Sequence, residues 1–313
     1  MGVPRQYLCR TLVRACQGNN AFVKQTLVAL ALLLHTLSAW AALLTAGQPQ
    51  SFVFTDSGHF AEKPIAVFYY KSKNAGKDAK VLFSIHGADR SGKRARDNWI
   101  DFAEKHGAIV LAPEFDSARF PNALFQFGGM RDEDRARWTF GIIERLFERI
   151  RTQEQLTTPS YVLFGHSAGA QFVHRFVLLM ADAKYSVAVA ANAGSYTLPV
   201  YPSSMPELKF PWLLDQRLVD GAALKHVLGR RLVVLLGEDD IRTDSVRLPK
   251  SREAVAQGAN RLQRGRNFYA SAKSQAEKSG VPLAWQLVTV PGVGHNSRDM
   301  SKAAEKVLME QAM

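Results

Sequence analysis

Short apolar runs alternate with longer amphipathic stretches through most of this chain. Runs of this length predict buried strands, because each is too short for a helix and is bounded by turn-forming residues. The runs cover 81–85, 108–111, 161–164, 186–190, 231–236 and 285–290. Over 131–151, Trp138, Ile142, Leu146 and Ile150 share one stripe, which predicts an amphipathic helix. Strands that alternate with helices predict an α/β fold with a mostly parallel sheet covered on both faces.

The first 41 residues have a different pattern. Arginine and lysine residues without any acidic residue precede an apolar stretch, and Ala39 and Ala41 stand where a signal peptidase expects small residues. The pattern predicts a signal peptide over 1–41, cleavage after Ala41 and export to the periplasm or the medium. The alternative is an uncleaved membrane anchor over 26–46, since about 20 apolar residues can span a bilayer.

Composition fits one globular domain over 42–313. The chain has 313 residues, of which 47% are hydrophobic and 22% charged. Both cysteines, Cys9 and Cys16, precede the apolar stretch, so cleavage would leave none and no disulfide is expected. The predicted export therefore rests on the leader alone.

The formal net charge is +12, and loss of the four leader cations lowers it to +8. We interpret the two arginine clusters as solvated helix faces rather than a nucleic-acid surface, because no recognition motif accompanies them. Attraction to anionic surfaces is the alternative interpretation. The clusters are Arg131, Arg135 and Arg137, and Arg261, Arg264 and Arg266.

One pentapeptide carries candidate chemistry. Gly165-His166-Ser167-Ala168-Gly169 lies between the run 161–164 and a helix-like segment. A strand, a sharp turn carrying a serine and then a helix form a nucleophile elbow. The glycines are needed because side chains there would collide with the neighbouring strand or helix. We expect Ser167 to be a nucleophile.

A serine nucleophile needs a histidine base, and His295 is the candidate. It follows the run 285–290 on a Pro-Gly loop that can carry the imidazole over the elbow. His174 lies on the elbow helix and is expected to pack or face solvent. His226 precedes a strand and is expected to be structural.

The acid should follow the preceding strand, and the run 231–236 leads directly into Gly237-Glu238-Asp239-Asp240. A buried acid that holds a histidine must be placed by the strand end. Asp240 fits this reach best and Asp239 is the alternative. A hydrophilic turn without chemistry also stays open.

An oxyanion hole would complete the machinery. The turn at Gly87 exposes the amide of Ala88, and Ala168 follows the nucleophile, so these two backbone N–H groups are the candidates. His86 is expected to orient the loop. The sequence has no His-Glu-x-x-His, no Cys-x-x-Cys and no glycine-rich phosphate loop, so neither a metal nor another cofactor is expected.

Residues 195–229 are rich in proline and aromatic residues and follow the run 186–190. A segment at this position predicts a lid or an acyl-binding wall over the site, with Tyr196, Tyr201 and Trp212 as candidate substrate-binding residues. The alternative is a surface loop packed by its own aromatic residues.

From about residue 60 onward the chain resembles the α/β-hydrolase superfamily and, more narrowly, bacterial poly(3-hydroxybutyrate) depolymerase-like esterases. The stretches that carry the resemblance are Ile85-His86-Gly87, 111–115, 164–174, 191–194, Leu236-Gly237-Glu238 with Asp240, Gln257-Gly258 with Arg261, and 290–295. The resemblance implies an ester-cleaving serine enzyme with Ser167, Asp240 and His295 as its triad.

The chain departs from secreted depolymerases in two ways. Ala88 stands where they commonly have a cysteine, and the sequence ends without their linker and polymer-binding module. We therefore expect soluble esters or short hydroxyalkanoate oligomers as substrates, with a membrane partner only if the leader is retained. A serine peptidase or an acyltransferase would use the same triad, and a non-catalytic hydrolase-like binding protein is the alternative of another class.

Overall fold

The structure is a computed structural model that describes residues 43–205 and 207–310. The predicted signal peptide over 1–41, with both cysteines, lies outside the described residues. Leu44 to the carboxyl end forms one compact unit. No helix in the described part of the chain is long and apolar enough to cross a membrane.

The first described residues are bonded into this unit. The Leu44 amide donates to a carboxylate oxygen of Glu154 at 2.8 Å, and the Leu44 side chain is buried. Ala46 forms a β-bridge with Lys71. Leu44 and Ala46, at the carboxyl end of the alternative anchor over 26–46, therefore belong to the folded unit, and the anchor itself stays a prediction.

Eight strands form one sheet in the order β1-β2-β4-β3-β5-β6-β7-β8. β1 and β2 are antiparallel to their neighbours and all later pairs are parallel, which confirms the predicted mostly parallel sheet. The strands are β1 (Gln50–Phe54), β2 (Ile65–Lys71), β3 (Val81–Ile85), β4 (Ile109–Glu114), β5 (Tyr161–His166), β6 (Tyr185–Ala191), β7 (Leu232–Gly237) and β8 (Trp285–Val290).

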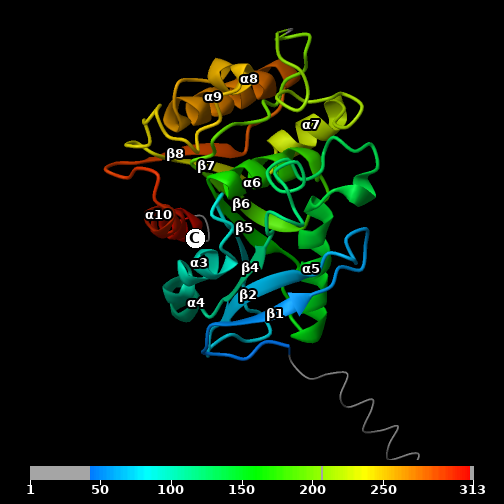
Figure 1. The fold of residues 1–313 in the computed structure, drawn as a ribbon, viewed down its shortest axis with the longest axis vertical. Helices are drawn as coiled ribbons and strands as arrows, with labels where there is room; N and C mark the ends of the chain where they lie inside the picture. The colour runs from blue at the N-terminus through cyan, green and yellow to red at the C-terminus, as the bar shows by residue number, and fades with distance from the viewer. Residues whose placement is uncertain (1–42, 206, 311–313) are drawn as a thin grey trace, which may run out of the picture. The chain divides into compact units, whose positions relative to one another are not determined.

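Helices cover both faces of the sheet (Figure 1). On one face, Phe102 and Met300 pack with Leu82, Val110 and Val233 in a core that joins α4 and α10 to the strands. α5, α6 and α9 lie on the other side. The helices are α3 (Gly92–Asp97), α4 (Ile100–His106), α5 (Phe140–Gln153), α6 (Ala168–Leu179), α7 (Gly221–Leu228), α8 (Arg252–Ala256), α9 (Arg261–Ser279) and α10 (Ser297–Glu310).

The strand predicted at 108–111 continues past its expected end. β4 includes Pro113, which lies opposite Val67 in the antiparallel pair with β2. The pairing of β4 with β3 ends at Leu111. Pro113 therefore lies beyond the part of β4 that pairs with β3, and its missing N–H breaks no hydrogen bond between these two strands.

The helix predicted over 131–151 begins at Phe140 instead, after a single 3₁₀ turn. The oxygens of Asp132 and Asp134 accept hydrogen bonds from backbone amides two residues ahead, at 3.0 and 2.9 Å. Aspartate side chains that bond to the local backbone compete with helix formation. The predicted stripe is nevertheless buried, and it consists of Trp138, Ile142, Leu146 and Ile150.

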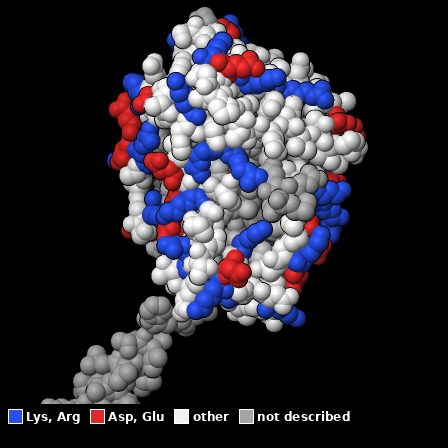
Figure 2. Space-filling model, turned by 180° about the vertical axis from the view of Figure 1, so that it is seen from behind, with Lys and Arg blue, Asp and Glu red and all other residues white. Residues whose placement is uncertain are grey.

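Charge is mixed over the surface. Figure 2 shows the face opposite to that of Figure 1, where Lys and Arg side chains lie among uncharged residues with Asp and Glu beside many of them. Arg131, Arg135 and Arg137 are exposed, as predicted, and Arg137 pairs with Asp132 and Asp134. In the other predicted cluster, Arg261 and Arg264 are buried.

Candidate active site

Ser167 lies on a tight turn between β5 and α6. Its φ of 57° is in the left-handed region, which costs a residue other than glycine about 1–3 kcal/mol. A Cβ at Gly165 would overlap the carbonyl oxygen of Gly169, and a Cβ at Gly169 would overlap that of Ile85. The flanking glycines are therefore required by close packing, as the elbow pattern predicted.

His295 lies between Ser167 and Asp240. Its Nε2 is 2.9 Å from Ser167 Oγ and its Nδ1 is 2.6 Å from Asp240 Oδ2. Nδ1–H donates to the carboxylate, and Nε2 is then free to accept the hydroxyl proton. The three side chains follow β5, β7 and β8, whose carboxyl ends meet at one edge of the parallel sheet.

The structure brings Asp240, and not Asp239, to His295. The Asp240 side chain is 2% exposed. Asp239 contributes to the loop through its backbone amide, which donates to Val293 O at 3.0 Å. The buried carboxylate also accepts from Arg261 Nη1 at 3.3 Å. Burial lowers the pKa of Arg261, and Asp240 opposes this shift.

Arg261 and Arg264 are buried, so the prediction that both face solvent is wrong; Arg266 on the same helix is exposed. Arg261 lies against the acid, and its Nε and Nη2 have no hydrogen-bond partner among the described residues. Arg264 Nη1 donates to Gly194 O at 2.6 Å and Pro249 O at 3.0 Å. α9 therefore turns two guanidinium groups inward behind the acid loop.

The predicted oxyanion donors lie around the elbow. Ala168 is the first residue of α6, where backbone N–H groups have no partner inside the helix. A Cβ at Gly87 would be 3.8 Å from Ser167 Cβ, so the loop that carries Ala88 lies beside the serine. These positions are compatible with the predicted pair of donors.

His86 orients this loop, as predicted. Its Nδ1–H donates to Gly87 O at 2.9 Å, and its Nε2 accepts from Phe115 N at 2.9 Å. Burial is the main reason that its pKa is lowered to about 4. The ring is therefore neutral and links the loop to the end of β4.

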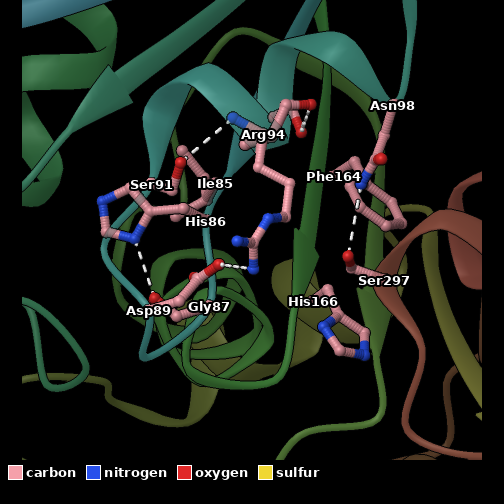
Figure 3. A pocket seen from close by; sticks show the side chains of 12 residues that line it. Ile85, His86, Gly87, Asp89, Ser91, Arg94, Asn98, Phe164, His166 and Ser297 are labelled. Carbon is pink, nitrogen blue, oxygen red and sulfur yellow. Dashed lines mark hydrogen bonds and ion pairs between the residues drawn. The ribbon is translucent and has the colours of Figure 1, made fainter.

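A small pocket lies between the loop after β3, α3 and the end of β5 (Figure 3). Its volume of about 30 Å³ suits a water molecule. Asn98 donates to Ser297 across it at 3.3 Å, and Arg94 donates to Asp89 at 2.7 Å. His166 also lines it, with an Nε2 that has no partner among the described residues.

The His166 ring packs against the ring of His295, with centroids 4.6 Å apart. Burial, followed by the charges of His295 and Arg261, holds the pKa of His166 well below its usual range. His166 therefore presents a neutral ring to His295. No role was expected for His166, although its position next to Ser167 in the sequence could have indicated that it lies at the site.

A larger pocket of about 390 Å³ includes His295 in its lining. It is lined by the acid, Arg261 and the loop 242–247, in which Val246 is 95% exposed. No role was expected for this loop, although its place directly after Asp240 in the sequence could have indicated one.

All three predicted substrate-binding residues have contacts within the protein. Tyr196 is fully buried and stacks on Phe268 at 4.4 Å between centroids, so the prediction that it contacts substrate is wrong. Tyr201 donates its hydroxyl to Val219 O at 2.9 Å. Trp212 is half-buried and packs edge-on against Phe127. Neither Tyr201 nor Trp212 lines the two pockets at the site, and their contact with substrate stays a prediction.

His174 packs in the core, as expected, and His226 lies exposed on α7. In the described part of the chain, no group of three or more His, Cys, Asp or Glu side chains could hold a metal ion.

Solved structures similar to this chain include two with more than 30% identity. The poly(aspartic acid) hydrolase-1 from Sphingomonas sp. KT-1 is 39% identical over 85% of this chain and 100% of its own, with a TM-score of 0.79. The poly(3-hydroxybutyrate) depolymerase from Bordetella parapertussis is 31% identical over 85% of this chain and 91% of its own, with a TM-score of 0.76.

An S-formylglutathione hydrolase from Agrobacterium tumefaciens is 16% identical over 86% of this chain and 96% of its own, with a TM-score of 0.54, and shares the fold. No protein-family model and no curated protein sequence matches the chain.

Proposed function

This chain belongs to the depolymerase-like serine esterases of the α/β-hydrolase superfamily, and from that premise we propose that it cleaves carboxylic esters through an acyl-enzyme on Ser167. The observation that carries the proposal is the unbroken hydrogen-bonded series from Ser167 through His295 to Asp240, at 2.9 and 2.6 Å. A hydroxyl that donates to a neutral imidazole held by a carboxylate is the arrangement that activates a serine.

The proposed reaction has two halves. Ser167 Oγ attacks the ester carbonyl as its proton moves to His295 Nε2, and Asp240 stabilises the imidazolium. The amides of Ala88 and Ala168 bind the oxyanion, and the alcohol leaves with the proton from Nε2. Water then attacks the acyl carbonyl and gives a proton to Nε2. The bond between the acyl carbon and Ser167 Oγ breaks, Oγ takes that proton from Nε2, and the acid leaves.

Short hydroxyalkanoate oligomers are our first substrate candidate, because one relative with 31% identity is a poly(3-hydroxybutyrate) depolymerase. Poly(aspartic acid) is the second, because a relative with 39% identity is named for its hydrolysis. Its units are joined by amide bonds, so this candidate would have the same triad cleave an amide and release an amine instead of an alcohol. Comparing hydroxybutyrate oligomers with poly(aspartic acid) at equal enzyme concentration distinguishes the two candidates.

We also propose that the protein is exported and that its mature form begins at Ala42. The support is the leader pattern of residues 1–41 together with the bonded position of Leu44. Amino-terminal sequencing of the protein recovered outside the cytoplasm tests this, and a retained leader would contradict it.

The central test combines a covalent probe with one substitution. A fluorophosphonate should label the wild-type protein at Ser167 and leave Ser167→Ala unlabelled. Ser167→Ala should lower turnover of a small activated ester by about 10⁴-fold or more while its circular dichroism is unchanged. Near-normal activity of this variant, or an unlabelled wild type that behaves as a binding protein, would refute the proposal.

A further inference from the structure

Asn192 is placed where the loops of the site meet. It directly follows β6, which lies between the elbow strand β5 and the acid strand β7 in the sheet. Its side chain is fully buried, and its φ of 52° is in the left-handed region. Asparagine tolerates that region better than most residues, whereas glycine adopts it without strain.

One amide group of Asn192 contacts both loops that carry the acid and the base. Its Oδ1 accepts from the backbone N–H of Gly237, at the start of the acid loop, at 2.8 Å. Its Nδ2 donates to the carbonyl oxygen of Gly294, next to His295, at 3.1 Å. The side chain therefore uses its acceptor on one loop and its donor on the other.

The acid loop and the base loop are also joined to each other without Asn192. Glu238 N donates to Val290 O and Asp239 N donates to Val293 O, both at 3.0 Å. A Cβ at Gly237 would overlap the carbonyl oxygen of Val293, which shows how closely the loops approach. The acid and the base can therefore move together as one unit.

The connection to the nucleophile comes from the same end of β6. Ser167 N donates to Ala191 O at 2.9 Å, and Asn192 N donates to Leu235 O at 3.0 Å. The backbone at 191–192 therefore bonds to the elbow, while the Asn192 side chain bonds to the acid–base unit.

We propose that Asn192 is a positioning residue that holds His295 and Asp240 at the correct distance from Ser167. The inference rests on the proposed serine mechanism and adds to it a residue that does not touch the reacting atoms. It explains why the position needs an amide: aspartate lacks the donor for Gly294 O, and glycine lacks both groups.

Asn192→Gly is the main test, because it removes the side chain and relieves the backbone strain together. Loss of the Asn192 hydrogen bonds to Gly237 and Gly294 should lower kcat by about 10- to 100-fold with KM changed less than about threefold. Misplacing a reacting group by about 1 Å has an effect of that size. Fluorophosphonate labelling of Ser167 should slow by the same factor, because the defect lies in nucleophile activation.

Gln155→Gly is the matched control. Gln155 has a φ of 52° and is exposed after α5, so this substitution relieves the same strain away from the site. It should leave kcat and the labelling rate unchanged. Asn192→Asp is the second variant, nearly identical in shape, and should lower kcat and the labelling rate while the fold is retained.

The outcomes separate a positioning role from a structural one. Wild-type kcat and labelling in folded Asn192→Gly would overturn the inference, as would failure of both Asn192 variants to fold. A loss of activity accounted for by the unfolded fraction would also overturn it. Full activity of Ser167→Ala would instead refute the proposed function.

Discussion

The carboxyl edge of the sheet and the segment 195–229 both lie outside regular helices and strands for most of their length, but their side chains form different kinds of contact. At the sheet edge, His295 bonds on one side to Ser167 and on the other to Asp240. In the segment 195–229, Tyr201 bonds to Val219 of the same segment. The edge joins polar groups from separate strands, whereas aromatic rings of the segment pack against residues outside it, such as Phe268 and Phe127.

Aromatic composition did not identify the residues that line the pocket beside His295. Tyr196 begins the segment that the sequence marked as a lid, yet it is stacked in the core. By contrast, the exposed loop 242–247 beside His295 holds few apolar residues and lines the larger pocket. Position at a strand end identifies the site better than side-chain type.

The largest expected effect tests the acid at the sheet edge. Asp240→Asn should lower kcat by about 10⁴-fold, because an amide cannot stabilise the imidazolium or keep the required tautomer. Asp239→Asn is the matched control and should stay within about threefold of wild type, since its side chain does not bond to His295. Equal losses in the two variants, measured on one activated ester, would refute the assignment.

A smaller effect concerns the histidine that joins the two regions. His174 donates from Nδ1 to Ala170 O and accepts from Thr197 N at 3.0 Å, and burial holds its pKa well below the usual range. A histidine that is neutral when folded takes up a proton on unfolding below about pH 6.5. The free energy of unfolding should therefore fall as pH drops from 6.5 toward the lowered pKa.

His86 shows the size of such an effect. Its pKa is lowered from 6.5 to about 4, and this difference corresponds to about 3 kcal/mol of stability lost when the pH falls through that range. Urea unfolding at pH 7 and pH 4.5 measures this loss of stability. His174→Gln should reduce the loss of stability, because one buried group no longer takes up a proton on unfolding. A larger loss in His174→Gln would contradict this explanation.

The smallest effect contrasts two tyrosines of the segment 195–229. The Tyr196 hydroxyl makes no well-formed hydrogen bond and has only a weak interaction with the Ala193 backbone, so Tyr196→Phe should change the free energy of unfolding by less than about 1 kcal/mol. Tyr201→Phe loses the bond to Val219 O and should lower it by about 1 kcal/mol. Thermal unfolding measures both.

Measuring KM tests whether Tyr196 contacts substrate. Because Tyr196 is buried, Tyr196→Phe should keep the wild-type KM for esters of every acyl length. A chain-length-dependent rise in KM would show that substrate reaches this tyrosine after all.

Local patterns were enough to predict most of the fold. The apolar runs at 81–85, 161–164 and 285–290 all became strands, and β8 has the predicted bounds. The elbow was also predictable, because the need for glycine on both sides of Ser167 arises within a few residues. The late start of α5 was not predicted, since the aspartates before it bond to their own backbone.

What the sequence determined by itself was the alternation of strands and helices and the residue types at the strand ends. Only the tertiary structure decided between Asp239 and Asp240, turned Arg261 and Arg264 inward, buried Tyr196 and placed the amide of Asn192 between two loops. The reason is physical: propensity and periodicity act over neighbouring residues, whereas these contacts depend on how loops from separate strands pack at one edge of the sheet.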